Sequence, residues 1–311
     1  MNKLRNGVEQ YLAVRRALGF KLHEEGRLLK GFVDFLEKEG SAVIITTDLA
    51  LQWAMRPTRC QPVRWSRRLS VVRQFAQYRS AEDPRTEVPP LGLLPHSYHR
   101  TAPYMYSDEE IARLIGAAKL LPSPLGLRGE TYRTFFGLLV VTGMRHSEAR
   151  QLDRDDVDLT DGILTVRVTK FGKSRLVPLH TSTRDALRRY ATLRDRIIPK
   201  PKSPSFFLSE RGAGLNRWTV YSTFDKLKRQ AGLQSSQGRR SPRIHDLRHR
   251  FATQTLLRLY RSGQEVGPHI TALATYLGHV DIASTYWYLS AVPELLSLVA
   301  GRLDGEHGGA V

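Results

Sequence analysis

The stretch that decides the fold reads His245-Asp-Leu-Arg-His-Arg-Phe-Ala-Thr253. From Leu247 onward, apolar residues recur every four positions, which predicts a helix over 246–260. His245 and Arg248 are three residues apart at the start of this helix, so they share one face. A helix N-terminus also favours a phosphate group. The stretch therefore predicts a helix that presents an imidazole and a guanidinium to an anion.

Three other segments carry residues of the same kind. Thr142-Gly-Met-Arg145-His-Ser-Glu148 lies upstream, while Leu277-Gly-His279 and Thr285-Tyr-Trp-Tyr288 lie downstream. Together with the first stretch they supply two arginines, two histidines and a tyrosine, spread over about half of the chain. We expect these side chains to converge on one phosphate.

Such a set suits the cleavage of a DNA phosphodiester. The reaction needs neutralised non-bridging oxygens, an in-line nucleophile and a proton for the leaving 5′ oxygen. Arginine grips two oxygens at once and stays charged, so Arg145 and Arg248 fit the first task without a metal. A tyrosine nucleophile gives a reversible phosphotyrosine. Because its ordinary pKa is near ~10, it needs a base or nearby cations, and His245 or the arginines could serve.

The helical period favours Tyr288 over Tyr286 as the nucleophile. Ile282, Tyr286 and Leu289 form the expected apolar stripe of a short helix over 281–289, and Tyr288 lies roughly 200° around from Tyr286. Each candidate alone has an ordinary interpretation, such as a paired arginine, a structural histidine or a half-buried tyrosine. Their joint occurrence in this order favours the site.

The charge of the chain indicates a polyanionic partner. Lys and Arg total 48 against 30 Asp and Glu, so the net charge is +18, and both residues 1–90 and the remainder are basic. Nucleic acid is the commonest such partner. The one cysteine fits a reducing cytoplasm. The sequence shows no signal peptide and no apolar run of ~20 residues that would span a membrane.

The chain is expected to form two domains of a mainly α fold with a small antiparallel β-sheet. Residues 1–88 read as a helical bundle, 89–104 as part of a proline-rich linker, and 105–311 as an α+β domain. Ser107 and Glu110 form a capping box at the start of the second domain. The alternating run 163–168 and the segment 176–177 predict a hairpin. The acidic run 153–158 is interpreted as a solvated turn and not as a metal site.

Over about residues 105–300 the sequence resembles the tyrosine recombinase, or phage integrase, family. TGMRHSEARQL at 142–152 resembles its TG-x-R-x-x-E-x-x-x-L box, and HDLRHRFAT at 245–253 resembles its H-x-L-R-H box. LGH at 277–279, followed nine residues later by Tyr288, resembles its last box. The ending TYWYL also resembles recombinases carried on bacterial transposable elements. Residues 1–88 resemble the family's core-binding domain only in size, helicity and basicity.

The resemblance implies a role for each matched residue. Arg145 and Arg248 correspond to the phosphate clamp, His245 to the general base and Tyr288 to the nucleophile. The remaining roles are His279 as a phosphate ligand, Glu148 as the acid that orients the first arginine, and a hairpin lysine as the general acid. Lys170 lies at the usual offset before Val177-Pro178-Leu179 and is preferred over Lys173, although the usual G-K-G-x-K turn is replaced by TKFGK.

The resemblance further implies double-stranded DNA with inverted half-sites as the partner. We expect four copies to assemble on two DNA segments, with or without sister recombinases, and no cofactor or metal. A C-terminal helix over 293–303 is expected to dock either on its own domain or on a neighbour. The expected DNA contacts are Arg64, Arg67, Arg68 and Arg73 in the first domain and Lys173, Arg175, Arg239 and Arg240 in the second.

Two other functions fit part of the pattern. A type IB topoisomerase shares the chemistry but relaxes DNA as a monomer. A catalytically silent DNA-binding protein on the same fold, such as an accessory subunit, would need no catalytic set. The full set of catalytic residue types and the basic N-terminal domain favour a site-specific recombinase that integrates or transposes DNA.

Overall fold

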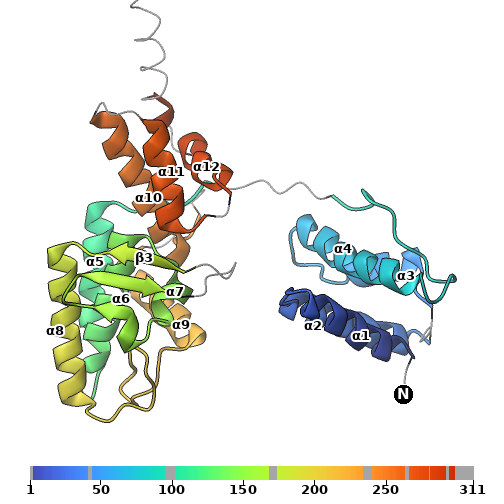
Figure 1. The fold of residues 1–311 in the computed structure, drawn as a ribbon, viewed down its shortest axis with the longest axis horizontal. Helices are drawn as coiled ribbons and strands as arrows, with labels where there is room; N and C mark the ends of the chain where they lie inside the picture. The colour runs from blue at the N-terminus through green and yellow to red at the C-terminus, as the bar shows by residue number, and fades with distance from the viewer. Residues whose placement is uncertain are drawn as a thin grey trace, which may run out of the picture. The chain divides into compact units, whose positions relative to one another are not determined.

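The structure is a computed structural model. It describes residues 3–40, 44–95, 102–167, 174–233, 240–262, 266–279, 281–291 and 294–297. The chain divides into a first unit, Met1–Arg100, and a second unit, Thr101–Val311, both drawn in Figure 1. The boundary falls inside the predicted linker at 89–104. The mainly helical fold with a small antiparallel sheet is confirmed.

The first unit is a bundle of helices, as predicted. Its elements are α1 (Lys3–Ala17), α2 (His23–Lys38), α3 (Thr47–Met55) and α4 (Pro62–Arg79). Thr46 caps α3 by accepting a hydrogen bond from the Leu49 amide at 3.3 Å. The inward face expected for α4 is buried, because Val72, Phe75 and Ala76 are 0% exposed. This row packs with apolar residues of the other three helices in one core.

The second unit contains eight α-helices and a short sheet in the residues that are described. The helices are α5 (Asp108–Lys119), α6 (Leu127–Thr142), α7 (His146–Arg150), α8 (Thr181–Ile197), α9 (Arg217–Gln230), α10 (Ile244–Arg261), α11 (Val266–Leu277) and α12 (Ala283–Ala291). The strands are β1 (Val157–Asp158), β2 (Ile163–Val166) and β3 (Arg175–Pro178), preceded by the 3-10 helix η1 (Arg154–Asp156). The antiparallel order β1-β2-β3 confirms the predicted hairpin, whose tip lies outside the described residues.

Helix α6 forms the centre of the second unit. Phe135 and Phe136 are 0% exposed, as expected for an almost wholly apolar helix. The Ser107–Glu110 capping box predicted for α5 is present. Gly143 ends α6 with φ at 61°, and a Cβ there would lie 2.4 Å from the Phe251 ring. Only glycine fits this turn, which leads directly into the site residues.

Helices α10, α11 and α12 form a separate small core, and they lie together at one end of the second unit in Figure 1. Leu256 and Leu277 are 0% exposed and pack in the same cluster as Tyr288. Leu295 is also 0% exposed in this cluster, so this residue of the predicted 293–303 helix packs on its own domain. Most of the remaining positions of that helix lie outside the described residues.

The interpretation of 153–158 as a solvated turn is wrong at one position. Asp156 is 4% exposed, accepts a hydrogen bond from the Asp153 amide at 3.0 Å and pairs with Arg167. The carboxylate is buried because it caps η1 and holds the start of the sheet. Among the described residues, no helix is both long and apolar enough to span a membrane.

Candidate active site

Arg145 is placed by the turn between α6 and α7. It is the N-cap residue of α7, and its amide donates to Glu148 Oε2 at 2.9 Å. Its guanidinium donates to Glu148 Oε1 at 2.8 Å and to the Gly278 carbonyl at 3.3 Å. The second bond connects the start of α7 to the end of α11, which lies 133 residues further along the chain.

Glu148 holds two arginines at once. It is 8% exposed, and Arg175 on β3 donates to its two carboxylate oxygens at 2.7 and 3.2 Å. Burial alone would raise the pKa of Glu148, but the hydrogen bonds and charges of Arg175 and Arg145 outweigh it and lower the pKa to about 2. The carboxylate therefore stays ionised at neutral pH and fixes both guanidinium groups.

Arg248 is clamped by backbone carbonyls. It is 2% exposed, and it donates to the Gly143 carbonyl at 3.0 Å and the Leu277 carbonyl at 2.6 Å. Both acceptors lie at helix C-terminal ends, where carbonyls lack a partner within the helix. A guanidinium has five N–H donors, so these two bonds to carbonyls leave other N–H groups free to bind an anion. Burial and the charge of Arg145 lower the pKa of Arg248 to about 10, which still leaves it charged.

The two predicted histidines flank this arginine pair. His279 follows Gly278, whose φ is 67°, and its Nδ1 lies 2.7 Å from the Thr285 hydroxyl. Burial and the charges of Arg248 and Arg145 lower the pKa of His279 to about 4. His245 lies in the first turn of α10 with an exposed side chain. The surrounding protein and the charges of His249 and Arg248 lower its pKa as well, so both rings are neutral at pH 7.

Tyr288 lies in this cluster, but the argument from helical periodicity that selected it is wrong. Its side chain is 2% exposed, whereas Tyr286 is 47% and Ile282 is 40% exposed. The buried face of α12 therefore runs through Thr285 and Tyr288, which are three residues apart. Thr285 is drawn inward by its contact with His279, and the Tyr288 ring stacks 6.2 Å from the His279 ring.

His249 belongs to the site but was not among the predicted site residues, although it lies in the HDLRH stretch. Its Nδ1 lies 3.2 Å from the Tyr288 hydroxyl, and its ring lies 4.6 Å from the His245 ring. The signal was available, because His249 lies four residues after His245 and therefore on the same helical face. The HDLRH stretch thus contributes three side chains to the cluster, where two were expected.

The candidate DNA contacts fall into four groups. Arg64, Arg67 and Arg240 have exposed side chains. Arg68 donates to the Trp53 carbonyl at 2.7 Å and stacks on the Trp53 ring, and Arg175 is held by Glu148, so both also have structural partners. Arg73 is half-buried. Lys173 and Arg239 lie outside the described residues, as does Lys170, the predicted general acid, and the whole set stays a prediction.

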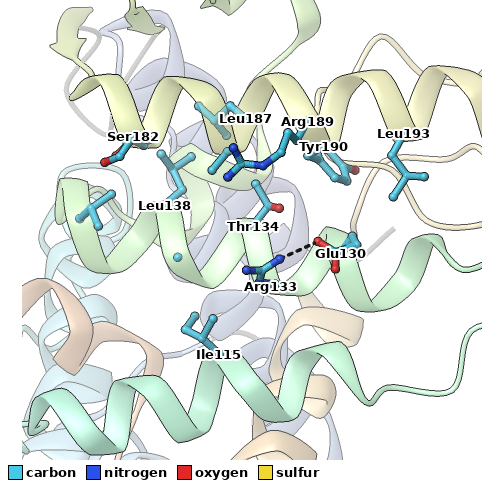
Figure 2. Close-up of a pocket in the computed structure, with 14 residues that line it drawn as sticks. Ile115, Glu130, Arg133, Thr134, Leu138, Ser182, Leu187, Arg189, Tyr190 and Leu193 are labelled. Atoms are coloured by element: carbon cyan, nitrogen blue, oxygen red, sulfur yellow. Dashed lines mark hydrogen bonds and ion pairs between the residues drawn. The ribbon is translucent and has the colours of Figure 1, made fainter.

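A pocket of about 380 Å³ lies elsewhere in the second unit. Figure 2 shows it between α5, α6 and α8, with the Glu130–Arg133 ion pair among its lining residues. None of the site residues lines it. In the part of the chain that the structure describes, no group of three or more His, Cys, Asp or Glu side chains is arranged to hold a metal ion. The metal-free chemistry stays a prediction.

Residues 105–294 match the phage integrase family. The chain belongs to this family of tyrosine recombinases, whose members are DNA strand transferases. It is 47% identical to y4rB of Sinorhizobium fredii, a protein classed by name as an integrase/recombinase, over 98% of both chains. It is 30% identical to the tyrosine recombinase XerD of Staphylococcus saprophyticus, over 72% of this chain and 70% of XerD.

Solved structures show the same fold. The Tn1549 transposon integrase, solved with transposon right-end DNA, superposes with a TM-score of 0.67 at 16% identity and covers 97% of this chain and 98% of its own. A lambda integrase dimer on a core site gives a TM-score of 0.62 at 18% identity, covering 92% of this chain and 76% of its own. The family predicted from the sequence is confirmed.

Proposed function

We propose that this protein is a site-specific DNA recombinase that cleaves and rejoins DNA through a 3′-phosphotyrosine at Tyr288. The observation that carries the proposal is the meeting of four distant segments. Arg145 bonds the end of α11, Arg248 bonds the ends of α6 and α11, and Tyr288 lies against His249 of α10. A scissile phosphate in this cluster would meet two guanidinium groups and a phenol.

Each side chain has one task in this mechanism. Arg145 and Arg248 neutralise the non-bridging oxygens of the phosphate, and Glu148 keeps Arg145 in place. His279 donates a hydrogen bond to a phosphate oxygen, and His245 shuttles the tyrosine proton. The phenol oxygen attacks phosphorus, the bond to the 5′ oxygen breaks, and Lys170 protonates the leaving oxygen. Because the Tyr288 ring is 2% exposed, the residues that cover it must open to admit the scissile phosphate before in-line attack.

The partner in this proposal is double-stranded DNA with inverted half-sites. The net charge of +18 and the exposed Arg64, Arg67 and Arg240 favour contacts with phosphates, so binding should weaken steeply with salt. The lambda integrase that shares the fold has also been solved as a tetramer on a Holliday junction. We extend this arrangement to the present chain, with four copies on two DNA segments.

The test is to trap the covalent adduct on genomic DNA fragments, separate it on a denaturing gel and sequence the attached DNA. The wild type should form a protein–DNA adduct that persists in EDTA. Tyr288→Phe should bind DNA normally and form no adduct. Tyr286→Phe is the matched control, since this tyrosine is two residues away and 47% exposed. It should form the adduct as the wild type does.

Two results would count against the mechanism. An undiminished adduct from Tyr288→Phe would move the nucleophile to another residue. Loss of the wild-type adduct in EDTA would show that cleavage needs a metal ion. Relaxation of supercoiled DNA by a monomer, with no recombinant product, would instead identify a type IB topoisomerase.

A further inference from the structure

His249 lies within hydrogen-bonding distance of the Tyr288 hydroxyl, with Nδ1 3.2 Å from Oη. Its ring is also fixed on two sides. The His245 ring meets it edge-on at 4.6 Å, and the Trp287 ring meets it at 5.4 Å. A ring held by two aromatic neighbours has little rotamer freedom, so its Nδ1 points in a defined direction.

We infer that His249 is a positioning residue for the nucleophile: its Nδ1 holds the Tyr288 hydroxyl in register with the two arginines. This inference rests on the proposed function of Tyr288. His249 follows Arg248 in the chain, so the rigid backbone of α10 fixes the two side chains relative to each other. A phenol tied to Nδ1 therefore stays at a set distance from the guanidinium that would hold the phosphate.

The protonation state of the ring supports this role. Burial and the charges of Arg243 and Arg248 lower the pKa of His249 to about 4. The neutral ring with its proton on Nε2 presents Nδ1 as an acceptor, so the phenol O–H donates to it. A neutral acceptor is thus present between pH 5 and pH 8. His249 is distinguished from His245, the proposed shuttle, by its contact with the Tyr288 hydroxyl, with Nδ1 3.2 Å from Oη.

Three substitutions separate positioning from packing. The amide of Asn places an oxygen where Nδ1 of histidine lies, whereas the longer Gln reaches toward the Nε2 position and Ala removes both. The rate of adduct formation is measured in single turnover, on a nicked duplex carrying the site sequenced from the wild-type adduct. DNA affinity and the thermal unfolding midpoint are measured for each variant.

We expect His249→Ala and His249→Gln to cleave between about 10-fold and 100-fold more slowly than the wild type, with unchanged DNA affinity. His249→Asn should cleave within about threefold of the wild type, because it restores the acceptor. A role in packing alone predicts the reverse order, with Gln closest to the wild type and rates that fall in parallel with the unfolding midpoint. That order would overturn the inference.

Two further outcomes are informative. If His249→Ala cleaves as fast as the wild type, the contact does not assist cleavage, and if it cleaves faster, the contact restrains Tyr288. Either result would also overturn the inference. If the wild type forms an adduct that Tyr288→Phe abolishes, any failure concerns His249 alone. If Tyr288→Phe still forms the adduct, the proposed nucleophile fails first.

Discussion

Replacing Glu148 with Gln removes the negative charge between Arg145 and Arg175. The carboxylate accepts hydrogen bonds from both guanidinium groups at 2.7 to 3.2 Å, and its side chain is 7% exposed. Gln keeps the size and one oxygen acceptor, but it leaves two cations facing each other around a buried position. We therefore expect Glu148→Gln to destabilise the fold and misplace Arg145.

The size of the effect follows from the pKa of Glu148. It lies at about 2 in the folded protein against 4.5 for an unperturbed glutamate. That difference corresponds to about 3 kcal/mol of folding stability at pH 7. Because Gln resembles the protonated acid in shape and charge, Glu148→Gln should lose about this amount. Because the folded pKa is the lower one, this stability is present above pH 4.5 and is lost as the pH falls toward 2. At pH 3.5 it should fall to about 2 kcal/mol.

Urea unfolding of the full chain at both pH values, followed by tryptophan fluorescence, measures the difference. Glu130→Gln is the matched control, because its ion pair with Arg133 is 32% and 43% exposed and should contribute less than about 1 kcal/mol. Equal stability of Glu148→Gln and the wild type at pH 7 would refute the reasoning. A loss that does not change with pH would refute the electrostatic part of it.

Three other changes have defined outcomes. Gly143→Ala should lower stability by about 3 kcal/mol, because the φ of this residue is 61° and the new Cβ meets Phe251. The loss is measured as a drop in the thermal midpoint, and an unchanged midpoint would contradict the requirement for glycine at this turn. Arg68→Gln should lower the midpoint and not only DNA affinity, since its guanidinium bonds two backbone carbonyls; weaker DNA binding at an unchanged midpoint would show a purely DNA-contacting role. Lys170→Ala should abolish cleavage of normal DNA and be rescued by a 5′-phosphorothiolate, whose leaving group needs no acid. Rescue of Lys173→Ala instead would reassign the acid.

The fold and the family were predictable because the signals were local and specific. The capping box of α5, the apolar α6 and the hairpin each depend on neighbouring residues, and the arginine and histidine boxes have fixed spacing. The burial of Tyr288 was not predictable in the same way. A nine-residue helix offers two alternative faces, and which one is buried depends on α10 and α11, which its own sequence does not contain.

The role of charged residues was also only partly predictable. Lys and Arg counts indicate a polyanionic partner, but they do not separate arginines that face solvent from arginines that hold the fold. Arg68 lies 3.6 Å above the Trp53 ring, and Arg175 donates to the Tyr276 carbonyl at 2.8 Å. Both contacts join residues far apart or on different elements, so composition and helical period give no sign of them.

The carbonyl partners of Arg248 have a consequence for how such a site changes over evolution. Gly143 and Leu277 bond the guanidinium through main-chain oxygens, which every amino acid possesses. Side-chain replacement at these positions cannot delete the acceptors; it can only disturb the path of the backbone. The clamp therefore depends on chain geometry, and a substitution at Leu277 that preserves the path of the backbone should preserve the acceptor.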